Sequence, residues 1–166
     1  MVLYVVRHAE ALPVGGAIKR DAERPLSPRG KQDAALVARA LARLDPSIGL
    51  ILTSPLLRAV QTGELLRADL DERAPVRVTE NLAPGFRVKA FLEELSRAGS
   101  IPSVAAIGHQ PDLGNLVAFL IADAGHAALT IPACTVARIL FDSSDLMGGA
   151  QLQWLVTPEV LRTFNP

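Results

Sequence analysis

The sequence lacks the features that mark secreted and membrane proteins. It contains one cysteine, Cys134, so no disulfide can form within the chain, and a reducing compartment is expected. No apolar run approaches the ~20 residues that a membrane-spanning helix needs. The short apolar run at the N-terminus ends at Arg7-His8 and is not typical of a signal peptide. We therefore expect a cytoplasmic protein with no membrane partner.

The sequence also lacks an excess of charge of either sign. Seventeen basic residues balance seventeen acidic ones, which gives no general attraction for nucleic acid. Any anionic ligand must therefore be held by a local cluster of cations. With 166 residues, of which 49% are hydrophobic and 20% charged, the composition is typical of a globular protein. We expect a single domain over residues 1–166, present as a monomer.

Short apolar runs alternate with helical patterns along the chain. Strands are expected at 3–6, 48–52, 76–78, 104–107, 135–141 and 151–156. Helices are expected at 28–44, 55–70, 88–97 and 111–122, the first two opening on Ser27-Pro28 and Ser54-Pro55 as a cap followed by proline. Residues 10–24 are expected to form a loop, residues 81–85 a turn, and Gly148-Gly149 the turn of a C-terminal hairpin.

This alternation predicts an α/β fold. We expect a three-layer α-β-α sandwich with a mostly parallel central sheet and an antiparallel portion at its C-terminal end. Ligands of such sheets bind outside the carboxyl ends of the parallel strands. The residues that follow each strand are therefore the first candidates for a functional site.

Four basic side chains follow the predicted strands. Arg7 and His8 follow the first strand, Arg58 lies in the first turn of the helix after the second, and His109 follows the fourth. Helical side chains lean toward the helix N-terminus, so Arg58 is expected to point back at the strand ends. Each residue alone is most simply a solvated or structural polar group. Their convergence on one edge of one sheet predicts a shared site.

Arginine and histidine together favour an anion over a metal ion. The three histidines are far apart in sequence, and arginines would repel a cation, so we expect no metal and no cofactor. Guanidinium groups bind phosphate through two parallel hydrogen bonds. A histidine among arginines has its pKa lowered by like charge, which leaves a neutral ring able to attack phosphorus. The second histidine, if protonated, could stabilise the phosphoryl oxygens or donate a proton.

At these residues the chain resembles the histidine phosphatase superfamily, which includes the phosphoglycerate mutases. The stretch Val6-Arg7-His8-Ala9-Glu10 resembles the Arg-His-Gly signature of that superfamily, with alanine in place of glycine. Residues 54–62, Ser-Pro-Leu-Leu-Arg-Ala-Val-Gln-Thr, resemble its second motif, Ser-Pro-x-x-Arg-Ala-x-Gln-Thr. Gly108-His109 resembles its late Gly/Ser-His motif. Because glycine allows backbone angles that alanine does not, the residue at position 9 bears on the geometry of this loop.

Within the superfamily, the chain is most similar to the small SixA-type phosphohistidine phosphatases. Residues 7–11, 24–30 and 108–111 resemble the Arg-His-Gly-Asp-Ala, Arg-Pro-Leu-Thr-x-x-Gly and Ser-His-x-Pro stretches of that group. The resemblance implies a metal-independent phosphatase in which His8 is the nucleophile and is transiently phosphorylated. It implies a phosphate pocket formed by Arg7, Arg58 and His109, with Arg24 as a further substrate-binding group near the rim. The implied partner is a protein that carries phosphohistidine, in signal transduction.

Several alternatives stay open at the level of sequence. The segment from Gly63 to Ser103 is needed for a helix, a strand and a helix, so little chain is left for a lid and the pocket is expected to be open. The general acid could be Glu80, Glu10 or Asp21, or it could be absent, because imidazole is a weakly basic leaving group. A small-molecule phosphomonoesterase or a phospho-group binding module without turnover would carry similar residues. His126 matches no motif and is expected to be a cap or surface residue.

Overall fold

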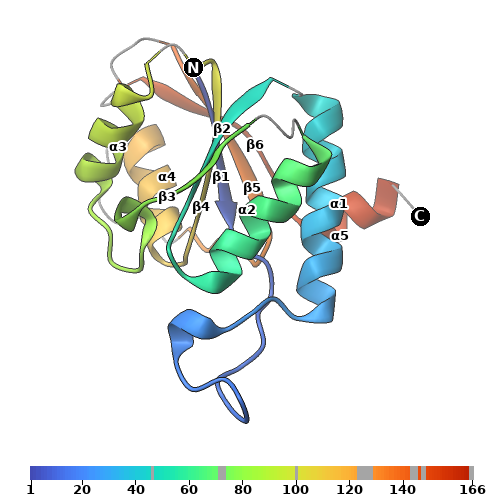
Figure 1. Ribbon diagram of the computed structural model, residues 1–166. Coiled ribbons are helices and arrows are strands. Elements are labelled where there is room, and N and C mark those ends of the chain that lie inside the picture. Colours follow the sequence, from blue (N-terminus) through green and yellow to red (C-terminus); the bar gives the residue numbers. More distant parts are fainter. Residues whose placement is uncertain are drawn as a thin grey trace.

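A computed structural model describes residues 1–45, 47–70, 74–99, 101–122, 129–142, 146 and 149–164. Its strands form one six-stranded sheet in the order β3-β2-β4-β1-β5-β6, with helices on both faces (Figure 1). The strands are β1 (Val2–Arg7), β2 (Ile48–Thr53), β3 (Val76–Val78), β4 (Ser103–Gly108), β5 (Val136–Phe141) and β6 (Ala150–Val156). The predicted three-layer α/β architecture is confirmed.

The strand directions also follow the prediction. β1 pairs in parallel with β4, and β2 pairs in parallel with both β4 and β3. β5 is antiparallel to β1 and to β6, so it runs against the other five strands. The C-terminal hairpin is therefore confirmed as a strand pair, although Gly148 of its predicted turn lies outside the described residues.

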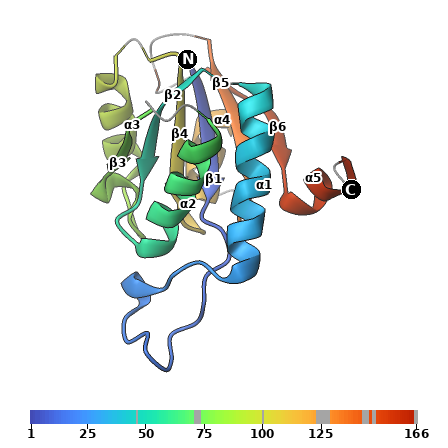
Figure 2. The same ribbon diagram turned by 45° about the vertical axis from the view of Figure 1, so that its right-hand side comes forward.

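The helices divide between the two faces of the sheet. Figures 1 and 2 show α1 (Pro28–Leu44) and α2 (Leu57–Asp69) on one face and α3 (Val88–Arg97) and α4 (Asp112–Ala122) on the other. A last helix, α5 (Pro158–Phe164), packs against α1 and was not predicted. Two short 3-10 helices, η1 (Asp21–Glu23) and η2 (Glu80–Leu82), lie where a loop and a turn were expected. No helix in the described part of the chain is long and apolar enough to cross a bilayer.

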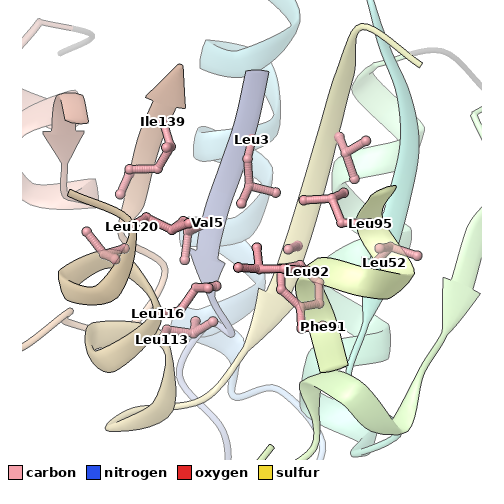
Figure 3. Packing of buried hydrophobic residues seen from close by; sticks show 14 of the residues in the cluster. Leu3, Val5, Leu52, Phe91, Leu92, Leu95, Leu113, Leu116, Leu120 and Ile139 are labelled. Atoms are coloured by element: carbon pink, nitrogen blue, oxygen red, sulfur yellow. The ribbon is translucent and has the colours of Figure 1, made fainter. Parts of the chain in front are cut away.

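Strand β1 shows how the sheet separates two cores. Leu3 and Val5 face α3 and α4 in one buried cluster that also contains Phe91 and Leu116 (Figure 3). The alternate residue Tyr4 belongs to the second cluster, on the side of α1 and α2. Side chains of a strand alternate between faces, so an all-apolar strand is what a sheet covered on both sides requires.

The order of the strands creates a topological switch point at the carboxyl ends of β1 and β4. These strands are neighbours, yet the chain leaves β1 toward α1 on one face and leaves β4 toward α4 on the other. The two connections therefore diverge from neighbouring strand ends. Such a point is where open α/β sheets bind their ligands.

The long connection after β1 is fastened to the start of α1. Ser27 caps this helix as predicted, its Oγ accepting a hydrogen bond from the Gly30 amide at 2.9 Å. The Ser27 amide donates to the Glu10 carbonyl at 2.9 Å, and the Ser27 hydroxyl donates to the Glu10 carboxylate at 2.5 Å. A Cβ atom on Gly30 would overlap that same Glu10 carbonyl group. Glycine at position 30 therefore allows the loop and the helix to approach closely.

We predict that Gly30→Ala destabilises the protein although alanine is the better helix former. The propensity gain of about 1 kcal/mol is outweighed by an overpacking cost of about 2–3 kcal/mol, because the overlapping atoms belong to the backbone. Urea unfolding should show a net loss of about 1–2 kcal/mol in the free energy of unfolding. The control is Lys31→Ala at the next, exposed position, which should stay within about 0.5 kcal/mol. Equal or higher stability of Gly30→Ala would contradict the close approach.

Candidate active site

The candidate site begins where three neighbouring strands end. Arg7, the last residue of β1, lies opposite Gly108, the last residue of β4, and the His8 amide donates to the Gly108 carbonyl at 3.1 Å. The Ser54 amide, directly after β2, donates to the Ile107 carbonyl at 2.9 Å. Backbone hydrogen bonds between strand ends therefore bring three segments together that are far apart in sequence.

Because β1 ends at Arg7, the next residue is free to turn toward the same site. Arg7 alternates with Val6 and extends toward the α4 side, where its Nη1 donates to the Ile131 carbonyl at 2.8 Å. His8 lies on the opposite side and reaches Arg58 of α2. The imidazole rings of His8 and His109 are 4.9 Å apart between centroids. The structure thus brings together Arg7, His8, Arg58 and His109, as predicted.

The hydrogen bonds of His8 determine which ring nitrogen carries the lone pair. Arg58 Nε lies 3.1 Å from His8 Nε2, and a guanidinium can only donate, so Nε2 is the acceptor. The proton is then on Nδ1, which donates to the Ala9 carbonyl at 2.7 Å. His8 is half-buried, and its unprotonated nitrogen faces Arg58.

Arg58 is the most constrained side chain of the cluster. Only 6% of the residue is exposed, although it carries a full charge. Its Nη1 donates to the Asp21 carbonyl at 2.9 Å, its Nη2 to Asp21 Oδ2 at 3.1 Å, and Nη2 also lies 3.5 Å from His109 Nδ1. The guanidinium therefore connects both histidines to the loop that follows β1.

His109 is positioned by Ser54, which corrects one prediction. Ser54 was expected to cap α2, but that helix begins at Leu57, and the capping residue is Leu56, which makes no side-chain cap bond. Ser54 Oγ instead lies 2.7 Å from His109 Nε2. With Arg58 facing Nδ1, this pairing favours a proton on Nε2 of His109 and a lone pair on Nδ1. The serine of the second motif thus orients the second histidine.

Both histidines titrate well below the usual range of imidazole. The pKa of His8 is lowered to about 4, mainly by burial and then by the positive charges of Arg58 and Arg7, while the bond to the Ala9 carbonyl opposes the shift. The pKa of His109 is lowered to about 3, again mainly by burial, then by His8 and Arg58. The lowering of the His8 pKa by like charge that the sequence suggested is present, but burial contributes more. His109 is therefore also neutral near pH 7. It could act as a cation only if a bound anion raised its pKa.

The segment 131–135 holds the backbone beneath these rings. The Cys134 amide donates to the carbonyls of Arg7 at 3.1 Å and His8 at 3.2 Å, and the Arg7 amide donates to the Thr135 carbonyl at 3.1 Å. Cys134 has a φ of 58°, the only positive φ of a non-glycine residue in the ranges described. It is buried, and burial raises the pKa of its thiol to about 12.

Ala9, which stands where the family signature has glycine, fits without strain. Its φ is not positive, and its side chain is fully buried in the cluster beside α1 and α2. Its amide donates to Thr62 Oγ1 at 3.1 Å, and that hydroxyl donates to the Arg58 carbonyl at 2.7 Å. Gln61 accepts a bond from the Leu26 amide at 2.8 Å. In the sequence, Gln61 and Thr62 were part of the second motif with no role assigned to them. The structure shows that their side chains connect the loop after β1 to α2.

Arg24 lies beside the cluster but makes its bonds within the loop. Its Nε donates to the Leu12 carbonyl at 2.6 Å, and its Nη1 donates to Asp21 Oδ1 at 3.0 Å. Its charge is close enough to contribute to the lowered pKa of His8. Arg24 therefore shapes the rim of the site in this state, and its contact with substrate stays a prediction.

The three candidate general acids differ in their surroundings. Glu10 accepts the Ser27 hydroxyl at the start of α1. Hydrogen bonds from Arg24 and Arg58 lower the pKa of Asp21, so this carboxyl is ionised at neutral pH. Glu80 is exposed on η2, beside the end of β4. An ionised Asp21 has no proton to donate to a leaving group near neutral pH.

The described residues outside this cluster form no metal-binding group. Among the described ranges, no group of three or more histidine, cysteine, aspartate or glutamate side chains could hold a metal ion. His126, expected to be a cap or surface residue, lies outside them. Buried Arg7 Nε has no hydrogen-bond partner within the same ranges, which is uncommon away from functional sites.

Comparison with known proteins agrees with this geometry. Residues 3–83 match the model of the histidine phosphatase superfamily (branch 1). The phosphohistidine phosphatase SixA of Escherichia coli K12 is 31% identical over 162 residues, covering 95% of this chain and 94% of SixA. A structure of the protein histidine phosphatase SixA complexed with tungstate superposes with a TM-score of 0.83 at 29% identity, covering 97% of this chain and 99% of that one.

A phosphatase with a different substrate has the same fold. A putative α-ribazole-5'-P phosphatase of E. coli K-12 superposes with a TM-score of 0.78 at 22% identity, covering 95% of this chain and 98% of that one. The fold is therefore shared by enzymes of more than one substrate class. The motifs, the near full-length match to SixA and the arrangement at the strand ends lead to one conclusion: the chain belongs to the histidine phosphatase superfamily, as a member of SixA type.

Proposed function

We propose that the protein removes the phosphoryl group from phosphohistidine on another protein, through a phosphorylated intermediate on His8. The observation that carries the proposal is the hydrogen-bonded state of His8, whose Nε2 lone pair lies among cations while its Nδ1 proton is held by the Ala9 carbonyl. In the first step, Nε2 gives up the hydrogen bond from Arg58 Nε, and its lone pair forms a bond to phosphorus as the bond to the substrate nitrogen breaks. The electron pair of the broken bond stays on the substrate imidazole. Positive charge develops on the ring of His8 and is stabilised by the Ala9 carbonyl.

In the second step, water attacks the phosphorus of the intermediate. The bond to Nε2 breaks, its electrons return to His8, and inorganic phosphate leaves after a proton is lost to solvent. Arg7 and Arg58 would stabilise the charge on the phosphoryl oxygens in both steps. A bound dianion would raise the pKa of His109, so this ring could become the cation that the sequence suggested. A relative complexed with tungstate, an oxyanion, supports an anion pocket of this type.

The acid–base properties of the site favour an imidazole leaving group. A sugar alkoxide leaves only if a nearby acid protonates it, whereas the conjugate acid of imidazole has a pKa of ~6.5. Asp21 is ionised, Glu10 is bonded to Ser27, and Glu80 is exposed to solvent. The resting site therefore suits a substrate that needs little or no proton donation.

The rim of the site supports a protein substrate. Leu12 is 38% exposed, Val14 52% and Leu57 36%, and all three lie near the carboxyl edge of the sheet, on the loop after β1 or at the start of α2. Figure 1 shows that loop extending beyond the strand ends. Apolar side chains around a cationic pocket offer contact area to a protein surface and little to a small sugar phosphate. We propose that the chain acts as one domain toward such a partner and uses no metal.

We predict a preference for protein phosphohistidine that depends on this rim. The wild-type kcat/KM should be higher on a phosphohistidine-bearing protein than on a panel of sugar and nucleotide phosphates. Leu12→Ser with Val14→Ser should lower kcat/KM about tenfold on the protein and leave free phosphohistidine unaffected, because roughly 0.7 kcal/mol of contact is lost at each position.

The matched control is Leu44→Ser, which changes an equally apolar and 62% exposed side chain at the far end of α1. This variant should match the wild type on every substrate. A wild-type preference for the phosphate panel would overturn the proposed substrate and favour the small-molecule phosphomonoesterase.

We predict that His8 stays neutral down to acidic pH. Its pKa of about 4 lies below the ordinary 6.5, so the folded protein takes up this proton only as the pH falls toward 4. Between 6.5 and 4 the unfolded chain binds the proton first, so this group lowers stability as the pH falls through that window. Nitrogen NMR of the imidazole rings in phosphate-free buffer should show no protonation of His8 at pH 5.5, with assignment from a His8→Gln variant. Titration near 6.5 would contradict a buried neutral nucleophile.

A further inference from the structure

One acidic residue occupies the donors that a phosphoryl group would be expected to use. Asp21 accepts from Arg58 twice, through its carbonyl at 2.9 Å from Nη1 and through Oδ2 at 3.1 Å from Nη2. Its other carboxylate oxygen, Oδ1, accepts from Arg24 Nη1 at 3.0 Å. One carboxylate thus bridges two arginines, one of which lies at the centre of the site.

The contact joins a fixed partner to an exposed one. The Arg58 side chain is 7% exposed, whereas the Asp21 side chain is 57% exposed. Asp21 belongs to η1, a 3-10 helix of three residues, none of which is buried. Figures 1 and 2 show the surrounding loop outside the body of the sheet. A change at this contact is therefore expected to move η1 rather than the guanidinium, because no residue of η1 is buried.

The chemistry of the two possible acceptors is alike. A guanidinium binds carboxylate and phosphate through the same pairs of N–H groups. A phosphoryl dianion that approaches Arg58 competes with Asp21 for Nη2 and is repelled by its carboxylate. The carboxylate is ionised near neutral pH, because bonds from Arg24 and Arg58 lower its pKa.

We propose that Asp21 is an internal competitor of the phosphoryl group: its carboxylate occupies Arg58 in the resting site, withdraws with the η1 loop when a phosphoryl group binds, and favours release of the phosphate product on its return. This inference rests on the proposed function only in taking the site as a phosphate pocket. It assigns Asp21 a role in limiting anion affinity and distinguishes it from a proton donor. The contact with Asp21 also satisfies the charge of Arg58.

The test is binding of inorganic phosphate, which requires no turnover. Asp21→Asn removes the charge and keeps the size of the side chain, so phosphate should bind about three- to tenfold more tightly in calorimetric titration, as expected for loss of a partly exposed charge. Asp21→Glu should restore the wild-type affinity. The gain should shrink at high salt, because the competition is electrostatic.

Two further variants make the result specific. Glu23→Gln changes a carboxylate of the same η1 helix that pairs with Arg20, and it should leave phosphate affinity unchanged. Arg58→Ala should abolish the binding, which shows that the titrated phosphate occupies this site. In turnover, Asp21→Asn should increase product inhibition by the same factor by which it increases affinity.

Equal or weaker phosphate binding by Asp21→Asn would overturn the inference. Weaker binding would mean that Asp21 supports the orientation of Arg58 instead of competing for it. This outcome is separate from failure of the proposed substrate. A protein that prefers sugar phosphates would still show tighter phosphate binding in Asp21→Asn, whereas unchanged binding with normal phosphohistidine hydrolysis would reject only the role of Asp21.

Discussion

The buried guanidinium of Arg58 is the interaction on which the site depends. A charge that is 6% exposed must be matched by hydrogen-bond acceptors, and Arg58 finds them in His8 Nε2 and in the carbonyl and carboxylate of Asp21. The hydrogen bond from Arg58 to Nε2 fixes the tautomer of His8. The bonds to Asp21 hold the loop after β1 against Arg58. Burial keeps both histidines neutral near pH 7, so His8 retains a lone pair for the nucleophilic role that we propose, while the arginines stay charged.

The fold supplies the place for this charge. β1 and β4 are neighbours whose connections leave toward opposite faces, and the residues that follow them, His8 and His109, lie together at that point. Apolar clusters on both faces of the sheet hold those strand ends in register. The backbone of the strand ends therefore positions the site residues, and few further polar side chains are needed to hold them.

Much of this arrangement could be predicted from the sequence, because it follows from strand ends. The positions of Arg7, His8, Arg58 and His109 needed only the strand order of a parallel sheet and the motifs that flank it. The pairing of Asp21 with Arg58 could not be predicted, because the connection from Glu10 to Arg24 has no periodicity that fixes its path. Such contacts depend on tertiary geometry rather than on local pattern.

Other differences have similar causes. Ser54-Pro55 has the pattern of a helix cap, yet the serine hydroxyl pairs with the second histidine and α2 begins later, at Leu57. The sequence suggested like charge as the cause of the low pKa of His8, but the degree of burial is a property of the packed structure.

The most direct test is to quench the reaction with a phosphohistidine protein under alkaline conditions and to map the phosphoryl group on the enzyme by mass spectrometry. We expect phosphorylation at His8, and we expect it to persist in His109→Asn. His8→Ala should show neither phosphorylation nor turnover. Phosphorylation at another residue, or full turnover by His8→Ala, would contradict the proposed mechanism.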